Sequence, residues 1–302
     1  MLKEKIERLK AEKDVVILAH YYVDGEVQEI ADFVGDSYAL AKKTVGLSQQ
    51  NIIFAGVSFM GESAKLLNPE KHVYMVDDTA GCGMADMIVA EQVKKVKTAY
   101  PDAAVVCYVN SSAEVKAVSD VCVTSSNAVK VVSGIESKQI YFIPDSNLAR
   151  FVAAALPEKE FIFHDGYCPI HQLIKKEDIL NAKEKYPNAV VMAHPECTKD
   201  VLDICDYVGS TSGIIDAVRE NDAEEFIIAT ETGVFHQLQK ENPTKKFYPA
   251  SDCQICHDMK KVTMEKILDI MENMDKHQEI ILEEEVIELA KKPLEQMLIL
   301  AK

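Results

Sequence analysis

Three of the eight cysteines recur at nearly equal intervals along the chain. Cys82, Cys168 and Cys256 are 86 and 88 residues apart, and each follows an apolar segment by a few residues. Thiolates bind iron and zinc, so three converging thiolates would form a metal site. A four-iron cluster held by three cysteines leaves one iron open to a substrate, on which it acts as a Lewis acid.

The wide spacing of these cysteines discriminates between kinds of metal site. Most structural zinc sites use short, closely spaced ligand pairs, whereas ligands this far apart indicate a metal at the junction of separate structural units. The spacing favours an iron–sulfur cluster, with a three-cysteine zinc site or no metal as alternatives. Cys253 forms a Cys-x-x-Cys pair with Cys256, and the repeat favours Cys256 as the ligand; Cys253 is then a bystander or a partner in a reversible disulfide. Cys107, Cys122 and Cys205 lie in apolar segments and are predicted to be core residues.

The same interval relates polar side chains that could bind substrate and transfer protons. Three sets of three residues show it. Within each set, the members lie 88 and 86 residues apart, and each member shortly follows an apolar segment. The sets are His20, Tyr108 and His194; Tyr22, Asn110 and Glu196; and Ser37, Ser125 and Thr211. The hydroxyl residues could instead be helix N-caps, and Glu196 could instead pair with a lysine. Four histidines lie outside this register. His171, three residues after Cys168, is expected to support that ligand, while His164, His236 and His257 are expected to be surface or structural residues.

Buried parallel strands are the elements that would position these residues. Apolar runs of four or five residues alternate with helical patterns, which is typical of α/β layering with right-handed crossovers. The expected strands are 15–19, 52–55, 73–76, 105–109, 140–143, 161–163, 190–193, 226–229 and 246–248. The expected helices include 26–47, 84–99, 113–118 and 175–185.

These elements and the repeated residues predict three similar αβα units of about 87 residues, each with three βα steps. The predicted ranges are 1–100, 101–186 and 187–271, followed by a helical tail over 272–302 that kinks or restarts at Pro293. Because ligands bind beyond the carboxyl ends of parallel strands, we expect the units to surround a central pocket about a pseudo-threefold axis.

Composition excludes several kinds of partner. The 302 residues carry a formal net charge of −16, which disfavours binding to nucleic acid or to anionic membranes. The sequence has no run of 18 apolar residues and no signal-peptide pattern, so we expect a cytoplasmic protein. An anionic substrate would have to be held by hydroxyls, histidines and backbone N–H groups.

Motifs along almost the whole chain resemble those of the quinolinate synthase family, the iron–sulfur enzymes of NAD biosynthesis. The resemblance rests on nine segments in order: 17–22 (ILAHYY), 30–37 (IADFVGDS), 57–60 (VSFM), 108–111 (YVNS), 124–128 (TSSNA), 166–171 (GYCPIH), 194–197 (HPEC), 207–211 (YVGST) and 230–233 (TETG). One departure is Tyr21, where several relatives carry Asn.

This resemblance implies three homologous αβα domains about a pseudo-threefold axis and an oxygen-sensitive transferase. The family condenses iminoaspartate with dihydroxyacetone phosphate to quinolinate, with loss of phosphate and two waters. It implies a [4Fe–4S] cluster on Cys82, Cys168 and Cys256, acid–base roles for Tyr22 and Glu196, and catalytic roles for His20 and His194. The implied substrate-binding residues are His20, Ser37, Tyr108, Val109, Asn110, Ser125, His194, Pro195, Glu196 and Thr211.

Such an enzyme depends on another that produces iminoaspartate. Two other functions stay open from the residues. One is a dehydratase that uses an open cluster on a hydroxy acid, and the other is a redox- or iron-sensing protein in which Cys253 and Cys256 report oxidation.

Overall fold

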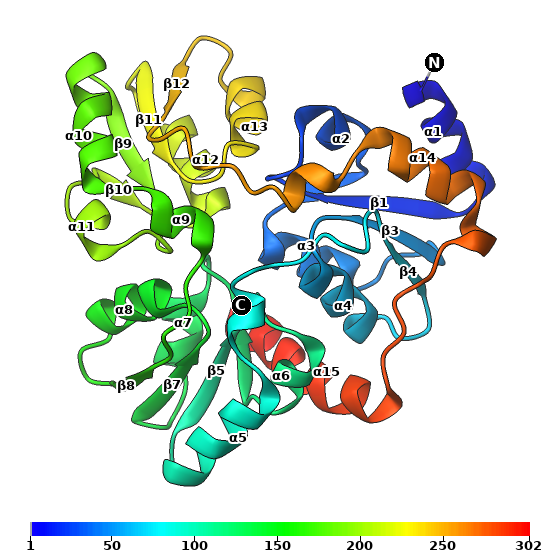
Figure 1. Cartoon of the computed structure of the whole chain (residues 1–302), viewed down its shortest axis with the longest axis horizontal. Helices are drawn as coiled ribbons and strands as arrows, with labels where there is room; N and C mark the ends of the chain where they lie inside the picture. Colours follow the sequence, from blue (N-terminus) through cyan, green and yellow to red (C-terminus); the bar gives the residue numbers. More distant parts are fainter. Residues whose placement is uncertain (1) are drawn as a thin grey trace.

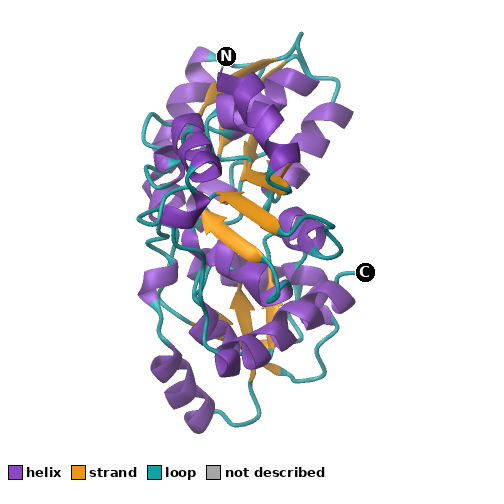
Figure 2. Ribbon diagram, turned by 90° about the vertical axis from the view of Figure 1, so that its right-hand side faces the viewer, coloured by secondary structure: helices purple, strands orange, loops and turns teal. Residues whose placement is uncertain are grey.

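A computed structural model describes residues 2–302. It contains three parallel sheets of four strands, and all three have the same topology (Figure 1). Their orders are β2-β1-β3-β4, β6-β5-β7-β8 and β10-β9-β11-β12. Helices lie on either side of the strands, as the view in Figure 2 shows. The predicted α/β class with three αβα units is therefore confirmed; the boundaries between units stay a prediction.

Each sheet takes its strands from one continuous part of the chain. The first part contains α1 (Leu2–Glu12), β1 (Val15–His20), α2 (Gly25–Ile30), β2 (Phe33–Gly35), α3 (Ser37–Thr44), β3 (Asn51–Ala55), α4 (Ser58–Leu67) and β4 (His72–Met75). The second contains η1 (Ala85–Met87), α5 (Ala90–Ala99), β5 (Ala104–Tyr108), α6 (Ala113–Ala117), β6 (Val121–Val123), α7 (Ala128–Ser133), β7 (Gln139–Ile143), α8 (Ser146–Ala155) and β8 (Glu160–Phe163). The third contains α9 (Pro169–Leu173), α10 (Lys176–Lys185), β9 (Val190–Ala193), α11 (Lys199–Leu202), β10 (Tyr207–Val208), α12 (Thr211–Glu220), β11 (Glu225–Ala229), α13 (Val234–Glu241) and β12 (Lys246–Pro249). The chain ends with η2 (Met259–Lys261), α14 (Met264–Glu272), η3 (Met274–Lys276) and α15 (Glu284–Leu300).

The nine expected strands are all present, but each sheet has a fourth short strand that the sequence analysis missed. These strands, β2, β6 and β10, are only three, three and two residues long. The prediction of three βα steps per unit is therefore wrong. The predicted single helix over 26–47 is also wrong, because β2 separates α2 from α3. Likewise, the helix expected over 84–99 is a 3₁₀ turn followed by α5.

A repeated aspartate holds each of these short strands in register. Asp32, Asp120 and Asp206 each accept a hydrogen bond of 2.8 Å from a backbone N–H of the neighbouring strand, at Ile17, Val105 and Val191 respectively. The same three aspartates return a backbone N–H to the carbonyl of that strand residue. This part of the repeated sequence therefore has a structural role, away from the carboxyl ends of the strands.

The hydrophobic core is divided unequally among the sheets. One continuous cluster of buried residues joins the first sheet, the second sheet and the C-terminal helices α14 and α15. The third sheet instead has two clusters of its own. The third sheet and its helices therefore have a core separate from the one that the other two sheets share.

Helix α15 belongs to the shared core and packs chiefly on α6 and β6 (Figure 1). Its approach crosses the edge of β4, where Ile280 donates its backbone N–H to the Val73 carbonyl over 2.8 Å. The helix runs through Pro293 without a break, so the predicted restart there is wrong, while the predicted kink stays a prediction. Burial of Pro293, Leu294 and Met297 stabilises the helix despite the backbone hydrogen bond that proline cannot make. No helix formed by residues 2–302 is both long and apolar enough for a membrane span.

Candidate active site

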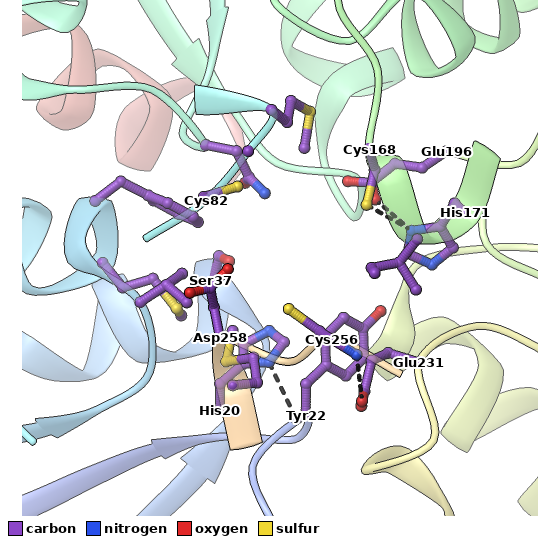
Figure 3. A pocket seen from close by; sticks show the side chains of 18 of the residues that line it. His20, Tyr22, Ser37, Cys82, Cys168, His171, Glu196, Glu231, Cys256 and Asp258 are labelled. Carbon is purple, nitrogen blue, oxygen red and sulfur yellow. Dashed lines mark hydrogen bonds and ion pairs between the residues drawn. The ribbon is translucent and has the colours of Figure 1, made fainter. Parts of the chain in front are cut away.

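A cavity of about 220 Å³ lies beyond the carboxyl ends of the strands, between the three sheets. Twelve of the predicted residues line it: His20, Tyr22, Ser37, Cys82, Tyr108, Asn110, Ser125, Cys168, His194, Glu196, Thr211 and Cys256. The three cysteines approach it from different sides (Figure 3). Val109 and Pro195 are buried and do not line it. His257 also lies at the cavity, and it is exposed, as expected of a surface residue.

An equivalent hydrogen bond positions the three cysteine loops. The first residue of α4, Ser58, donates its backbone N–H to Ala80. In the second unit Ser146 donates to Gly166, and in the third Thr232 donates to Gln254, with all three distances between 2.8 and 3.1 Å. Each accepting residue lies two positions before the cysteine. The same backbone contact thus holds an equivalent loop in each of the three units.

Buried carboxylates hold two of these loops further. Asp145 accepts the backbone N–H of Cys168 over 3.1 Å, and Glu231 accepts that of Cys256 over 3.1 Å. The corresponding residue in the first unit is Val57, which cannot accept such a bond. The sequence analysis assigned no role to either acid, although Glu231 lies in the segment 230–233 on which the resemblance rests.

Lys260 connects the third cysteine loop to Tyr22. Its ammonium group lies 3.2 Å from the Glu231 carboxylate and donates to the Tyr22 carbonyl over 2.7 Å. The backbone of Tyr22 therefore depends on the same residues that position Cys256.

The protonation of the cysteines bears on which metal group they fit. Burial raises the pKa of the Cys82 thiol to about 12 and raises the pKa values of Cys168 and Cys256. Burial makes three neighbouring thiolates costly without a cation between them. A soft metal centre supplies that positive charge, so the donor set fits a thiolate-bound metal group.

The spread of the sulfurs separates a cluster from a single ion. Among the described residues, the one group of three ligand atoms within 4.8 Å of one another comes from Cys168, His171 and Glu196. The three cysteine sulfurs are therefore more widely spread than around a single zinc ion, whose sulfur ligands lie about 2.3 Å from the metal. The arrangement fits a group with several metal ions.

Glu196 is the buried anion of the cavity, and it accepts two short hydrogen bonds. The Tyr108 hydroxyl donates to it over 2.6 Å, and His171 Nδ1 lies 2.7 Å from its other oxygen. Burial opposes the charge, but attraction to His194 and His171, together with these hydrogen bonds, lowers the pKa of Glu196 to about 2. The alternative that Glu196 pairs with a lysine is wrong, since its partners are His171, His194 and Tyr108.

A continuous chain of hydrogen bonds leads from Glu196 to Tyr22. His171 Nε2 lies 2.9 Å from the Thr230 hydroxyl, which lies 2.7 Å from the Tyr22 hydroxyl. Burial, together with repulsion by Glu196, raises the pKa of Tyr22 well above its ordinary value. Protons can pass between a carboxylate and a phenol along such a chain. Sequence analysis expected His171 to support Cys168, and His171 Nδ1 does lie 3.2 Å from that sulfur. It gave no role to Thr230, although this residue directly follows β11 and opens the segment 230–233 on which the resemblance rests.

His20 and His194 have matching environments in the first and third units. The Nδ1 atom of each accepts a backbone N–H from two residues further on, at Tyr22 and Glu196, over 3.1 and 3.3 Å. This fixes the proton on Nε2. Burial is the main reason why the pKa of each ring is lowered to about 3. Both histidines are thus neutral donors, and His194 Nε2 lies 3.1 Å from the Ser125 hydroxyl.

The hydroxyl residues of the repeat are not helix caps. Asp36 caps α3 by accepting from Ala39, and Ser210 caps α12 by accepting from Gly213. Ser37 and Thr211 are each one residue further along, at the first helical position, and line the cavity. Nearby, the side-chain oxygen of Asn110 is buried with no hydrogen-bond partner within the described chain. It can accept an N–H from a bound molecule.

Comparison with known proteins bears on this arrangement. The family model of the Quinolinate synthetase A protein matches residues 4–299. The chain belongs to this family. It is 52% identical to the quinolinate synthase of Fusobacterium nucleatum over 300 residues, which cover 99% of both chains. It is 50% identical to the quinolinate synthase of Clostridioides difficile, over 96% of this chain and 94% of that one. It is 47% identical to quinolinate synthase 2 of Methanosarcina acetivorans, over 99% of this chain and 95% of that one. Membership of the quinolinate synthetase A family confirms the resemblance inferred from the motifs.

Proposed function

We propose that the protein is a quinolinate synthase of NAD biosynthesis that condenses iminoaspartate with dihydroxyacetone phosphate. The products are quinolinate, one phosphate and two waters. The observation that carries this proposal is the meeting of three cysteines with the Glu196–Tyr22 hydrogen-bond chain in one cavity. The proposal includes a [4Fe–4S] cluster on Cys82, Cys168 and Cys256, and an enzyme that supplies iminoaspartate.

The cavity suits two anionic substrates in an acidic protein. Its lining residues include no lysine or arginine among the described residues. Neutral donors instead face the space: His20 and His194 through Nε2–H, and Ser37, Ser125 and Thr211 through their hydroxyls. Hydrogen bonds from such donors to carboxylate and phosphate are charge-assisted and strong when water is excluded. We assign the unpartnered oxygen of Asn110 as the acceptor of the N–H of the imine.

The reaction needs several proton transfers, and the hydrogen-bond chain supplies groups for them. Forming one carbon–carbon and one carbon–nitrogen bond and removing water moves protons between carbon, nitrogen and oxygen. Glu196 accepts a proton as carboxylate, and Tyr22 donates one from its hydroxyl, with His171 and Thr230 carrying protons between them. When bound, the cluster would supply an iron with an open position, which makes a hydroxyl a better leaving group.

The test of this proposal is an anaerobic assay of the full chain after reconstitution with iron and sulfide. We expect about four irons per chain, and quinolinate and phosphate in a ratio of one to one when both substrates are present. An iron-loaded protein that forms no quinolinate from these substrates, but dehydrates a hydroxy acid, would instead identify the other dehydratase considered above.

A glycine at the junction of the first and third sheets gives a further prediction. A β-carbon on Gly233 would lie 2.6 Å from the backbone of Tyr22, which is closer than atoms can approach. In Gly233→Ala, Tyr22 must therefore move relative to Thr230. Because a displacement of about 1 Å can cost about 100-fold in rate, we expect kcat to fall by about that factor. The measurement is kcat beside the iron content, which should not change.

The matched control for this variant is Gly134→Ala. A β-carbon there meets its nearest neighbour at an ordinary 3.5 Å, and the residue lies outside the cavity. Its kcat should stay within about twofold of the wild type. Wild-type turnover in Gly233→Ala would contradict the role given to this contact.

A further inference from the structure

The most compact ligand set in the cavity is not the three-cysteine set. His171 Nδ1 lies 3.2 Å from Cys168 Sγ and 2.7 Å from Glu196 Oε2, and all three ligand atoms lie within 4.8 Å of one another. His171 and Glu196 are buried, with exposed fractions of 1% and 4%. Thiolate, imidazole and carboxylate are the three ligand types that zinc takes in proteins.

We propose that the cluster-free protein binds one zinc-like divalent cation through Cys168, His171 and Glu196. This site goes beyond the proposed function, since it holds a single ion and uses only one of the three cysteines assigned to the cluster. The fourth ligand would be a water from the adjoining cavity, because all three residues line it.

Charge and hydrogen bonding both favour such an ion. The cation replaces the proton that His171 Nδ1 shares with its two neighbours. Binding releases the thiol proton of Cys168, so one thiolate and one carboxylate balance the two positive charges and no net charge is buried. The remaining imidazole proton then lies on Nε2, which is 2.9 Å from the Thr230 hydroxyl. Donation to that oxygen fixes the ring orientation, as second-sphere partners of zinc-binding histidines do.

This binding and cluster assembly exclude each other, because both require the Cys168 thiolate. The same ion also occupies the Glu196 and His171 atoms that the proton chain uses. A divalent cation of this class is therefore a competitive inhibitor of cluster assembly, and cluster-loaded protein is resistant to it.

The test titrates the full-length, cluster-free chain with Co²⁺, an absorbing substitute for Zn²⁺, under anaerobic conditions. We expect one Co²⁺ per chain, with a thiolate-to-cobalt charge-transfer band and four-coordinate d–d bands, and displacement by one equivalent of Zn²⁺. Zinc added before iron and sulfide should lower iron incorporation at least tenfold. The readout needs no turnover, so its failure leaves the proposed function untouched.

Variants distinguish this site from a three-cysteine site. Cys168→Ala should remove the charge-transfer band and weaken Co²⁺ binding at least 100-fold, and Glu196→Gln should weaken it at least tenfold. Thr230→Val, which removes the hydrogen-bond partner of His171 Nε2 but no metal ligand, should weaken it about tenfold. Cys82→Ala and Cys256→Ala should bind Co²⁺ within about twofold of the wild type.

Three outcomes would overturn the proposal: no stoichiometric Co²⁺ binding, an unchanged band in Cys168→Ala, or loss of binding in Cys82→Ala or Cys256→Ala. The last would indicate a three-cysteine ion instead. Circular dichroism of each variant checks its fold. Should Cys168→Ala be unfolded, the Glu196→Gln and Thr230→Val affinities decide the question, because a Cys82–Cys168–Cys256 site would not respond to them.

Discussion

Cys168→Ala should abolish both iron binding and quinolinate formation. The surroundings of Cys168 hold it in place, since Asp145 accepts its backbone N–H and His171 lies 3.2 Å from its sulfur. Without its thiolate, only two cysteine ligands remain in the cavity, too few for a cluster normally held by three or four. We expect less than a tenth of the wild-type iron after anaerobic reconstitution, and turnover below detection.

The matched control is Cys107→Ala. Cys107 is fully buried in β5, directly opposite Cys122 on β6, and it does not line the cavity. Alanine there removes one sulfur from the core but no ligand, so iron content and kcat should stay close to the wild type. If Cys107→Ala lost the cluster while Cys168→Ala kept it, the ligand assignment would be wrong.

Glu196→Gln should lower kcat about 1,000-fold with the iron retained. The substitution keeps the size of the side chain and an oxygen that can accept from Tyr108. It removes the negative charge and the ability to take up a proton, which isolates Tyr22 from its base. General acid–base residues contribute about 10²- to 10⁴-fold, and Glu196 ends the only hydrogen-bond chain in the described residues that reaches Tyr22 through His171 and Thr230. The measurements are kcat, iron per chain and the pH dependence of kcat.

Glu62→Gln serves as the control for this variant. Glu62 is partly buried, and it accepts the Ala113 backbone N–H over 2.8 Å, but it lies outside the cavity. Its replacement should leave kcat within about threefold. A Glu196→Gln enzyme with more than a tenth of wild-type kcat would show that the proton enters or leaves by another group.

Sequence alone predicted those features that depend on periodicity. The nine longer strands are continuous apolar runs. The repeat interval alone predicts that His20, Tyr108 and His194 lie at equivalent strand ends. An apolar run is a local pattern and the repeat interval is a regular one, so both can be recognised in a single sequence. The same reasoning brought all three cysteines to one cavity.

Features that depend on a few tertiary contacts were missed. Strands of two or three residues, such as β10, are fixed by a single aspartate side chain rather than by a hydrophobic pattern. Thr230 gains its importance only because Tyr22 and His171, from distant parts of the chain, lie on either side of it. The sequence could not show whether Ser37 and Thr211 are helix caps. A cap and the first helical residue are adjacent in the chain, and only the backbone geometry distinguishes them.

Helix α15 has a consequence for how the protein is made. It follows every strand of the three sheets in chain order, so a ribosome makes it after all of them. The first two sheets therefore cannot complete their shared core until residues made after the third sheet are available, and until then the surface that α15 covers is open to water. The third sheet, whose core needs no residue after Ala250, can fold earlier. The order of folding would then not follow the order of synthesis, although nascent domains generally fold from the amino terminus onwards.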